Sequence, residues 1–138
     1  MQRCLLEHQY VAYRDPATGS TSGIYTAGLL ERLGLAQELK PKLHLDRSEG
    51  DVPENVFLGV AKGEIEMQIG QITEIAIAPG VDLAGPLPSE IQNTTLMAAG
   101  IITTSKAPDA ARAFIGFISS PSAVAVLKAS GFQPVDKN

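Results

Sequence analysis

Short apolar runs and longer helical stripes follow one another along the first half of the chain. The apolar residues 11–13 end at a polar Arg-Asp-Pro turn, which is typical of a buried strand. Between residues 24 and 33 three leucines recur at helical spacing, and Gly34 follows where a C-terminal cap belongs. Residues 42–45 indicate a second short strand. The pattern therefore predicts the order strand, helix, strand.

The middle of the chain repeats this order. Asp51 and Pro53 are typical of the start of a helix, which should end near Gly63. Residues 64–69 alternate acidic or amide side chains with Ile and Met, as a half-buried strand does. Residues 71–76 then predict one or two helical turns.

Two further β-type segments are expected before the C-terminal third. Residues 81–87 indicate a short strand broken by glycine and proline, and residues 94–104 form a long apolar run that we expect to be buried. A helix with one apolar face opens at Pro108. Ser120 and the proline after it start another helix, which Gly131 ends.

Strands that alternate with helices predict the fold class α/β, with a parallel-rich mixed sheet flanked by helices and further helices at the C-terminus. In such sheets ligands bind at the carboxyl ends of the strands, where loops lead into helices. Three loops are expected in that position: residues 14–23, 47–53 and 70–74.

Composition changes this picture mainly by exclusion. The chain has 138 residues, the length of one domain, and a formal net charge of −4. Its Lys and Arg residues form no cluster along the sequence, which argues against nucleic acid or an acidic membrane as a partner. A small anion remains a possible ligand, because backbone N–H groups can bind it without net positive charge.

Few residues offer metal or redox chemistry. Cys4 is the only cysteine, and His8 and His44 are the only histidines, so we expect no intrachain disulfide, metal site or cofactor. No stretch approaches the roughly 20 apolar residues that span a bilayer. Residues 1–10 lack the apolar core of a signal peptide, and we expect a residual helix there.

The first loop is rich in small hydroxyl and glycine residues. Ser20, Thr21, Ser22 and Gly23 stand at or just before the start of the predicted helix. Unpaired N–H groups at a helix start favour an oxyanion, and hydroxyls add donors. One hydroxyl that simply caps the helix explains the same residues. The loop is not a phosphate-binding P-loop, since it lacks the Gly-Lys-Ser/Thr sequence.

The other two loops offer weaker signals. Asp51 and Glu54 resemble a capping box, which needs no ligand, although the N–H of Val52 would be available to one. Gln71 and Thr73 follow the alternating strand directly and could donate hydrogen bonds into a cleft. A polar turn that caps a short helix explains them equally well.

The sequence assigns no catalytic residue. No nucleophile elbow surrounds the serines of the first loop, so a catalytic triad is not expected. Glu64 and Glu66 are typical of the solvent-facing side of a strand. Tyr13 and Tyr25 could assist a proton transfer. Arg14 is the strongest candidate of this group, because a guanidinium can clamp a carboxylate.

Three stretches together resemble a known family: residues 11–35, residues 60–75 and residues 94–135. They are similar to the bacterial periplasmic solute-binding proteins, and within them to the molybdate-binding receptors of ABC transporters. The most specific part is the ending "SSPSAVAVLKASGFQPV", which looks like the closing helix and Gly-Phe tail of that group.

The resemblance implies a two-lobed receptor of which this chain is one part. Residues 11–92 would be a ligand-binding α/β lobe and residues 93–105 a crossover strand, while the helices of residues 106–138 would belong to the other lobe. It also implies a periplasmic parent protein and an ABC-type membrane transporter as a partner. Because the helices would lack the sheet on which they pack, we expect a homodimer or higher homo-oligomer.

The resemblance also carries oxyanion contacts onto Ser22, Val52 and Gln71. The molybdate receptors have an alanine in place of Ser22 and a tyrosine in place of Gln71. Both differences add hydrogen-bonding capacity, which suits an organic carboxylate at least as well as a metal oxyanion.

Two classes of function follow. The first is a solute-binding component of a transporter that holds a small oxyanion or carboxylate. The second is an isomerase or related enzyme that acts on a small polycarboxylic acid in the same cleft. A chain that only assembles with itself is a third possibility. The predicted ligand-binding residues are Arg14, Ser20, Thr21, Ser22, Gly23, Val52, Gln71 and Thr73.

Overall fold

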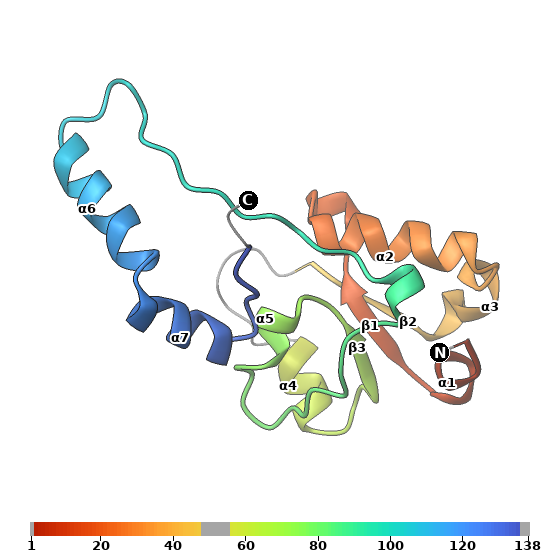
Figure 1. The fold of residues 1–138 in the computed structure, drawn as a ribbon. Helices are drawn as coiled ribbons and strands as arrows, with labels where there is room; N and C mark the ends of the chain where they lie inside the picture. The colour runs from red at the N-terminus through yellow and green to blue at the C-terminus, as the bar shows by residue number, and fades with distance from the viewer. Residues whose placement is uncertain (1, 48–55, 136–138) are drawn as a thin grey trace. The chain divides into compact units, whose positions relative to one another are not determined.

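The computed structural model describes residues 2–47 and 56–135. The chain divides into two compact units, Met1–Gln92 and Asn93–Asn138 (Figure 1). Each unit is described by itself below.

The first unit is built on a parallel sheet, which confirms the predicted α/β class. Its described strands are β1 (Val11–Arg14), β2 (Leu43–Asp46) and β3 (Met67–Ile69), in the order β2-β1-β3. Val11 is paired with Leu43 on one side and with Met67 on the other. Since both pairings are parallel, the carboxyl ends of the strands lie at one edge of the sheet.

Short helices connect and cover these strands. The longest is α2 (Thr21–Arg32), which follows β1. Gly34 adopts a positive φ of 71° just after α2, as predicted for a helix end. The other helical elements described in this unit are α1 (Gln2–Glu7), η1 (Pro16–Thr18), α3 (Ala36–Leu39), η2 (Lys40–Lys42), α4 (Val56–Ala61), α5 (Ile72–Ile75) and η3 (Ser89–Ile91).

The core lies mainly on one face of the sheet. That face carries two buried side chains of β1, leucines of α1, α2 and α3, and the leucine just before α3: Leu5, Val11, Tyr13, Leu30, Leu35 and Leu39. Full burial of each such side chain contributes about 1.5–3 kcal/mol. The opposite face holds a smaller cluster of Ala12 and Ile65, packed by Val60 of α4. The sheet is therefore held between helices on both faces.

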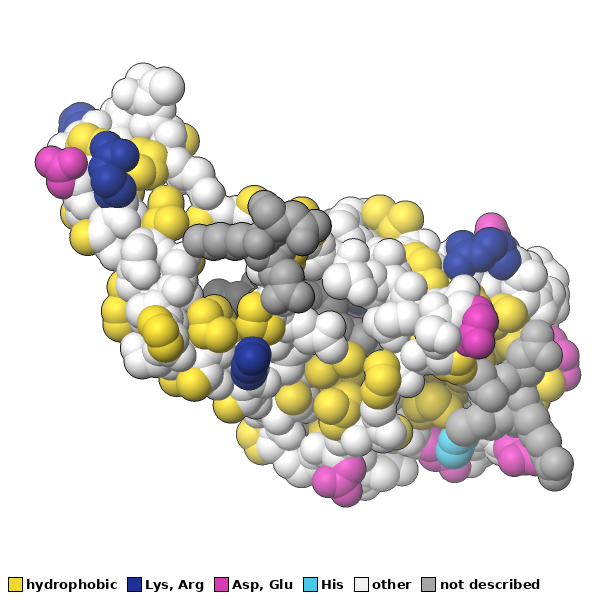
Figure 2. Space-filling model, viewed as in Figure 1, with side chains coloured by type: hydrophobic (Ala, Val, Ile, Leu, Met, Phe, Trp, Pro, Cys, Tyr) yellow, Lys and Arg dark blue, Asp and Glu magenta, His cyan; other side chains and the backbone are white. Residues whose placement is uncertain are grey.

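The second unit contains α6 (Pro108–Ile118) and α7 (Pro121–Ala129), as predicted. Ser120 caps α7 by accepting a hydrogen bond from the N–H of Ala123, and Phe132 donates its N–H back to the carbonyl of Leu127. None of the described residues 93–135 is buried, and Figure 2 shows hydrophobic side chains exposed along both helices.

The described helices are each too short or too polar to cross a membrane alone; α6 and α7 reach the required length and composition only when taken together across a bend of 63°.

Two predicted strands are wrong. Residues 81–87 form no strand, since Gly85 has a φ of 133° and the prolines around it lack the N–H that a ladder needs. Residues 93–105, all of them described, also contain no strand, and Leu96 is 72% exposed rather than buried. A β-type sequence without a neighbouring strand has no partner for its backbone groups. The assignment of these residues to a connection between lobes stays a prediction.

Candidate functional site

The carboxyl edge of the sheet is where the predicted loops leave the strands. The β1–β2 ladder extends one residue further, because the N–H of Asp15 donates to the carbonyl of Asp46 at 2.8 Å. The loop after β1 leads into α2, and the loop after β3 leads into α5. The predicted contact Val52 lies outside the described residues. The described groups of this edge therefore come from β1, α2, β3 and the first residue after β2.

The first turn of α2 brings the hydroxyl residues of the first loop together. Ser20 is the N-cap, and its Oγ accepts a hydrogen bond from the N–H of Gly23 at 3.4 Å. The hydroxyls of Ser20 and Ser22 are 3.0 Å apart. Thr21 and Ser22 occupy the first two helical positions, whose N–H groups have no acceptor in helix geometry. Capping by Ser20 and anion binding by the next two residues are therefore compatible.

Gly23 allows this turn to pack closely against the backbone at the end of β1. A Cβ atom at Gly23 would lie 2.3 Å from the carbonyl oxygen of Arg14 and 3.2 Å from the carbonyl carbon of Asp15. No other residue type fits this approach without a shift of the helix. The glycine thus has a packing role that explains it without a ligand contact.

Arg14 forms an ion pair within the sheet. Its Nη1 lies 3.3 Å from Oδ2 of Asp46, the residue with which it is paired in the ladder. The side chains of Arg14 and Asp46 are 26% and 10% exposed. The guanidinium predicted to clamp a ligand therefore already has a half-buried carboxylate beside it.

A second ion pair, between Asp15 and Arg47, was not predicted. The Nε–H of Arg47 donates to Oδ2 of Asp15 at 2.7 Å, and the other carboxylate oxygen accepts the N–H of Ala17 at 2.8 Å. These two hydrogen bonds, that of Ala17 first, lower the pKa of Asp15 below its ordinary value. The only sequence signal was that each partner lies two residues after the end of a predicted strand.

The end of β3 supplies amide groups. Gln71 is the N-cap residue of α5, and it and Thr73 are half-buried. Gln68 of β3 is paired with Ala12 of β1 in the ladder. Its Oε1 is buried and has no hydrogen-bond partner in the described part of the chain. Because α5 has four residues, the side chains and not a helix dipole are what this segment offers.

The two tyrosines considered for proton transfer are engaged elsewhere. Tyr13 belongs to the core, and burial raises its pKa above the ordinary value. Tyr25 donates its hydroxyl to the carbonyl of Ile91, and its ring faces the guanidinium of Arg32 at 5.5 Å. Neither tyrosine is placed as a base at the carboxyl edge.

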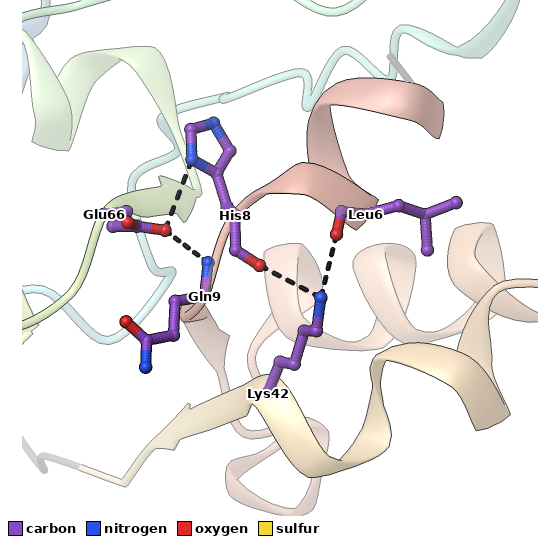
Figure 3. A network of polar contacts seen from close by, with 5 residues as sticks. All are labelled: Leu6, His8, Gln9, Lys42 and Glu66. Carbon is purple, nitrogen blue, oxygen red and sulfur yellow. Dashed lines mark hydrogen bonds and ion pairs between the residues drawn. The ribbon is translucent and has the colours of Figure 1, made fainter.

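The amino edge of the sheet carries a different polar network (Figure 3). Lys42 precedes β2 and donates to the carbonyls of Leu6 and His8 at 2.8 and 3.3 Å. Glu66 precedes β3, accepts the N–H of Gln9 and lies 3.4 Å from Nδ1 of His8. Both charged side chains thus hold the segment between α1 and β1.

Among the described residues, no group of three or more His, Cys, Asp or Glu side chains could hold a metal ion.

The sequence of the chain is similar to those of known proteins. A family model described as bacterial extracellular solute-binding protein matches residues 5–133. A protein of Pseudomonas sp named aconitate isomerase is 32% identical over 139 aligned residues. That alignment covers 97% of this chain and 48% of the relative, so the chain spans about half the relative's length. No solved structure gives a significant match.

Proposed function

Because the chain belongs to the bacterial extracellular solute-binding proteins, we propose that its carboxyl edge forms part of a binding site for a small polycarboxylate. The observation that carries this proposal is the first turn of α2, which stands at the end of the central strand with Ser22 beside its cap. N–H groups and the helix dipole at such a turn favour negative charge.

A carboxylate is favoured over a tetrahedral metal oxyanion for two reasons. Ser22 and Gln71 add hydrogen-bonding groups where the molybdate receptors have alanine and tyrosine. The similar Pseudomonas protein is named for aconitate. Val52 and Thr73 remain predicted contacts of the same ligand.

The test is a calorimetric titration of the chain with trans-aconitate, citrate, molybdate, sulfate and phosphate. We expect trans-aconitate or citrate to bind more tightly than the three inorganic ions. Ser22→Ala and Gln71→Ala should each weaken that binding while the far-ultraviolet circular dichroism is unchanged. Preferred binding of molybdate, or equal binding by both variants, would contradict the proposal.

In a full-length parent protein, the bound solute would be delivered to an ABC-type membrane transporter from the periplasm. The family's description as extracellular solute-binding supports this role. The expected result is that the parent protein stimulates transport of the same acid that this chain binds. A transporter assay in membrane vesicles, with the parent protein added or omitted, measures it.

A second candidate function is isomerisation of the bound acid, which the 32% identity to a protein named aconitate isomerase favours. Such a reaction would move a proton between carbon atoms and needs a base near the ligand. Incubation with trans-aconitate in D₂O, followed by NMR, tests this function. Deuterium incorporation or a new isomer would support it, whereas unchanged spectra of an acid that binds would exclude it.

The exposed faces of α6 and α7 support self-association. Phe114 and Phe117 are 62% and 63% exposed, and Val126 of α7 is 67% exposed. Apolar surface of this kind usually marks an interface. Native mass spectrometry should show a homo-oligomer that Phe117→Glu dissociates, and a monomeric wild-type chain would contradict this expectation.

A further inference from the structure

We propose that Arg47, rather than Arg14, is the residue that recognises a carboxylate of the ligand. The inference deepens the proposed function and rests on it. It concerns specificity: a second carboxylate on the ligand would be bound by Arg47 while the first is held at the start of α2.

The two arginines differ in what surrounds them. Arg14 lies in the ladder beside Asp46, and both side chains are largely buried. Each arginine has a carboxylate beside it, and this carboxylate would repel a ligand carboxylate; at Arg14 the repulsion would act in a poorly solvated site. Arg47 keeps 77% of its side chain exposed, although its partner Asp15 is only 5% exposed.

The contact with Asp15 orients Arg47 without using up its donors. A guanidinium has five N–H donors, and the contact uses the one on Nε. The carboxylate of Asp15 is itself fixed, because its other oxygen accepts the N–H of Ala17. An arginine held by a fixed carboxylate loses less freedom on binding, and its remaining donors match a carboxylate in a bidentate manner.

The position of Asp15 relates Arg47 to the start of α2. Gly23 brings the first turn of α2 against the backbone of Arg14 and Asp15. The carboxylate that holds Arg47 and the turn that carries Ser22 therefore belong to the same end of β1. The guanidinium of Arg47 and the N–H groups at the start of α2 are thus two positive groups at one edge, and they fit a di- or tricarboxylate better than a monocarboxylate.

Arg112 of α6 provides a matched comparison. It is 72% exposed and also lies near an aspartate, at 4.0 Å from Asp109. That aspartate is 99% exposed, so the pair is an ordinary surface contact. Exposure and an acidic neighbour alone therefore do not distinguish Arg47; the buried, doubly hydrogen-bonded carboxylate does.

The experiment is a calorimetric titration of the full chain and its variants with trans-aconitate and with acetate. Arg47→Gln should weaken trans-aconitate binding roughly 10-fold to 100-fold, the effect of losing a charged hydrogen-bonding partner. Arg112→Gln should leave it unchanged. Acetate, with one carboxylate, should bind far more weakly than trans-aconitate to the wild-type chain, and Arg47→Gln should change its affinity little.

Arg47→Lys guards against a folding defect, because it keeps a cation beside Asp15. It should bind trans-aconitate about threefold to tenfold more weakly at an unchanged melting temperature. The reason is that an ammonium lacks the planar pair of N–H donors with which a guanidinium binds both oxygens of a carboxylate. If both Arg47 variants bind like wild type while Ser22→Ala loses affinity, the inference is wrong and the proposed function stands. If the wild-type chain binds none of the acids, the proposed function is wrong and the inference falls with it.

Discussion

The two edges of the parallel sheet use the same kinds of charged residue in opposite ways. At the amino edge, Lys42 and Glu66 are hydrogen-bonded to backbone groups of the segment before β1. At the carboxyl edge, Arg47 is held by the buried Asp15 and stays 77% exposed. The amino edge uses its charges to fix the chain, whereas the carboxyl edge presents a cation and a helix start to solvent.

This difference between the edges indicates which polar groups are available to bind a ligand. A charged group whose hydrogen bonds go to the chain's own backbone contributes to stability, and a ligand would have to break those bonds. A charged group that is oriented by a buried partner but remains exposed can add a ligand without loss. Stability should therefore depend on both edges, and ligand binding on the carboxyl edge alone.

The largest expected effect comes from Gly23, which seats α2 on the carboxyl edge. Gly23→Ala places a Cβ atom 2.3 Å from the carbonyl oxygen of Arg14, so the helix start must move. We expect a loss of about 2–3 kcal/mol in the free energy of unfolding and a loss of anion binding. Urea denaturation and calorimetric titration measure the two effects.

Gly28→Ala in the same helix is the matched control. A Cβ atom there meets only the end of the flexible Arg32 side chain, at 3.7 Å. Alanine should therefore stabilise the helix by about 0.5–1 kcal/mol and leave binding unchanged. Equal effects at the two glycines would show that the close approach at Gly23 determines neither the stability of the fold nor anion binding.

The next largest effect is expected from a substitution at the amino edge. Lys42→Met keeps most of the apolar stem and removes the hydrogen bonds to Leu6 and His8. The free energy of unfolding should fall by roughly 1–2 kcal/mol, with no change in trans-aconitate affinity. Lys40→Met, at an exposed neighbour, should change stability by less than about 0.5 kcal/mol. Weaker ligand binding by Lys42→Met would contradict the division between the edges.

The smallest effect is a pH dependence that both edges share. Hydrogen bonds from the backbone N–H groups of Gln9 first and then Tyr10, together with the nearby His8, lower the pKa of Glu66 below its ordinary value of 4.5. The pKa of Asp15 is likewise lowered below its ordinary value of 3.8. A carboxylate with a lowered pKa in the folded state stabilises the fold above its unfolded pKa, and this contribution is lost as pH falls through the folded value.

We therefore expect the melting temperature to fall below about pH 4.5 and to be flat above it with respect to these two groups. Glu66→Gln should make the acid limb shallower mainly by lowering the neutral plateau, because the contribution of the carboxylate is present at neutral pH and already lost in acid. An acid limb that is unchanged in Glu66→Gln would show that the carboxylate of Glu66 does not contribute.

The sequence predicted the elements whose signals are local. The helix start at Pro121 and the strands β1 and β2 follow from capping residues and periodicity, and the structure confirms them. Of the strand predicted at residues 64–69, only residues 67–69 form β3, and the hydroxyl that caps α2 is that of Ser20. The residues at 94–104 were wrongly predicted as a strand, because β-propensity does not reveal whether a partner strand is present.

The contacts between distant residues were not predictable in this way. Asp15 and Arg47 meet because β1 and β2 are adjacent and parallel, and the sequence gives no register for that pairing. The same holds for Glu66 and the segment at His8, which are joined only because β3 lies on the other side of β1. Arg14 was the natural candidate for a clamp until the register placed Asp46 beside it.

The most direct test of the division between the edges is the ¹H–¹⁵N correlation spectrum of the chain during titration with trans-aconitate. We predict shifts of the backbone amides of residues 15, 17–24, 47 and 70–73, and unshifted amides at residues 8–10, 42 and 64–67. Shifts confined to the amino edge, or a spectrum that does not change at all, would contradict the account.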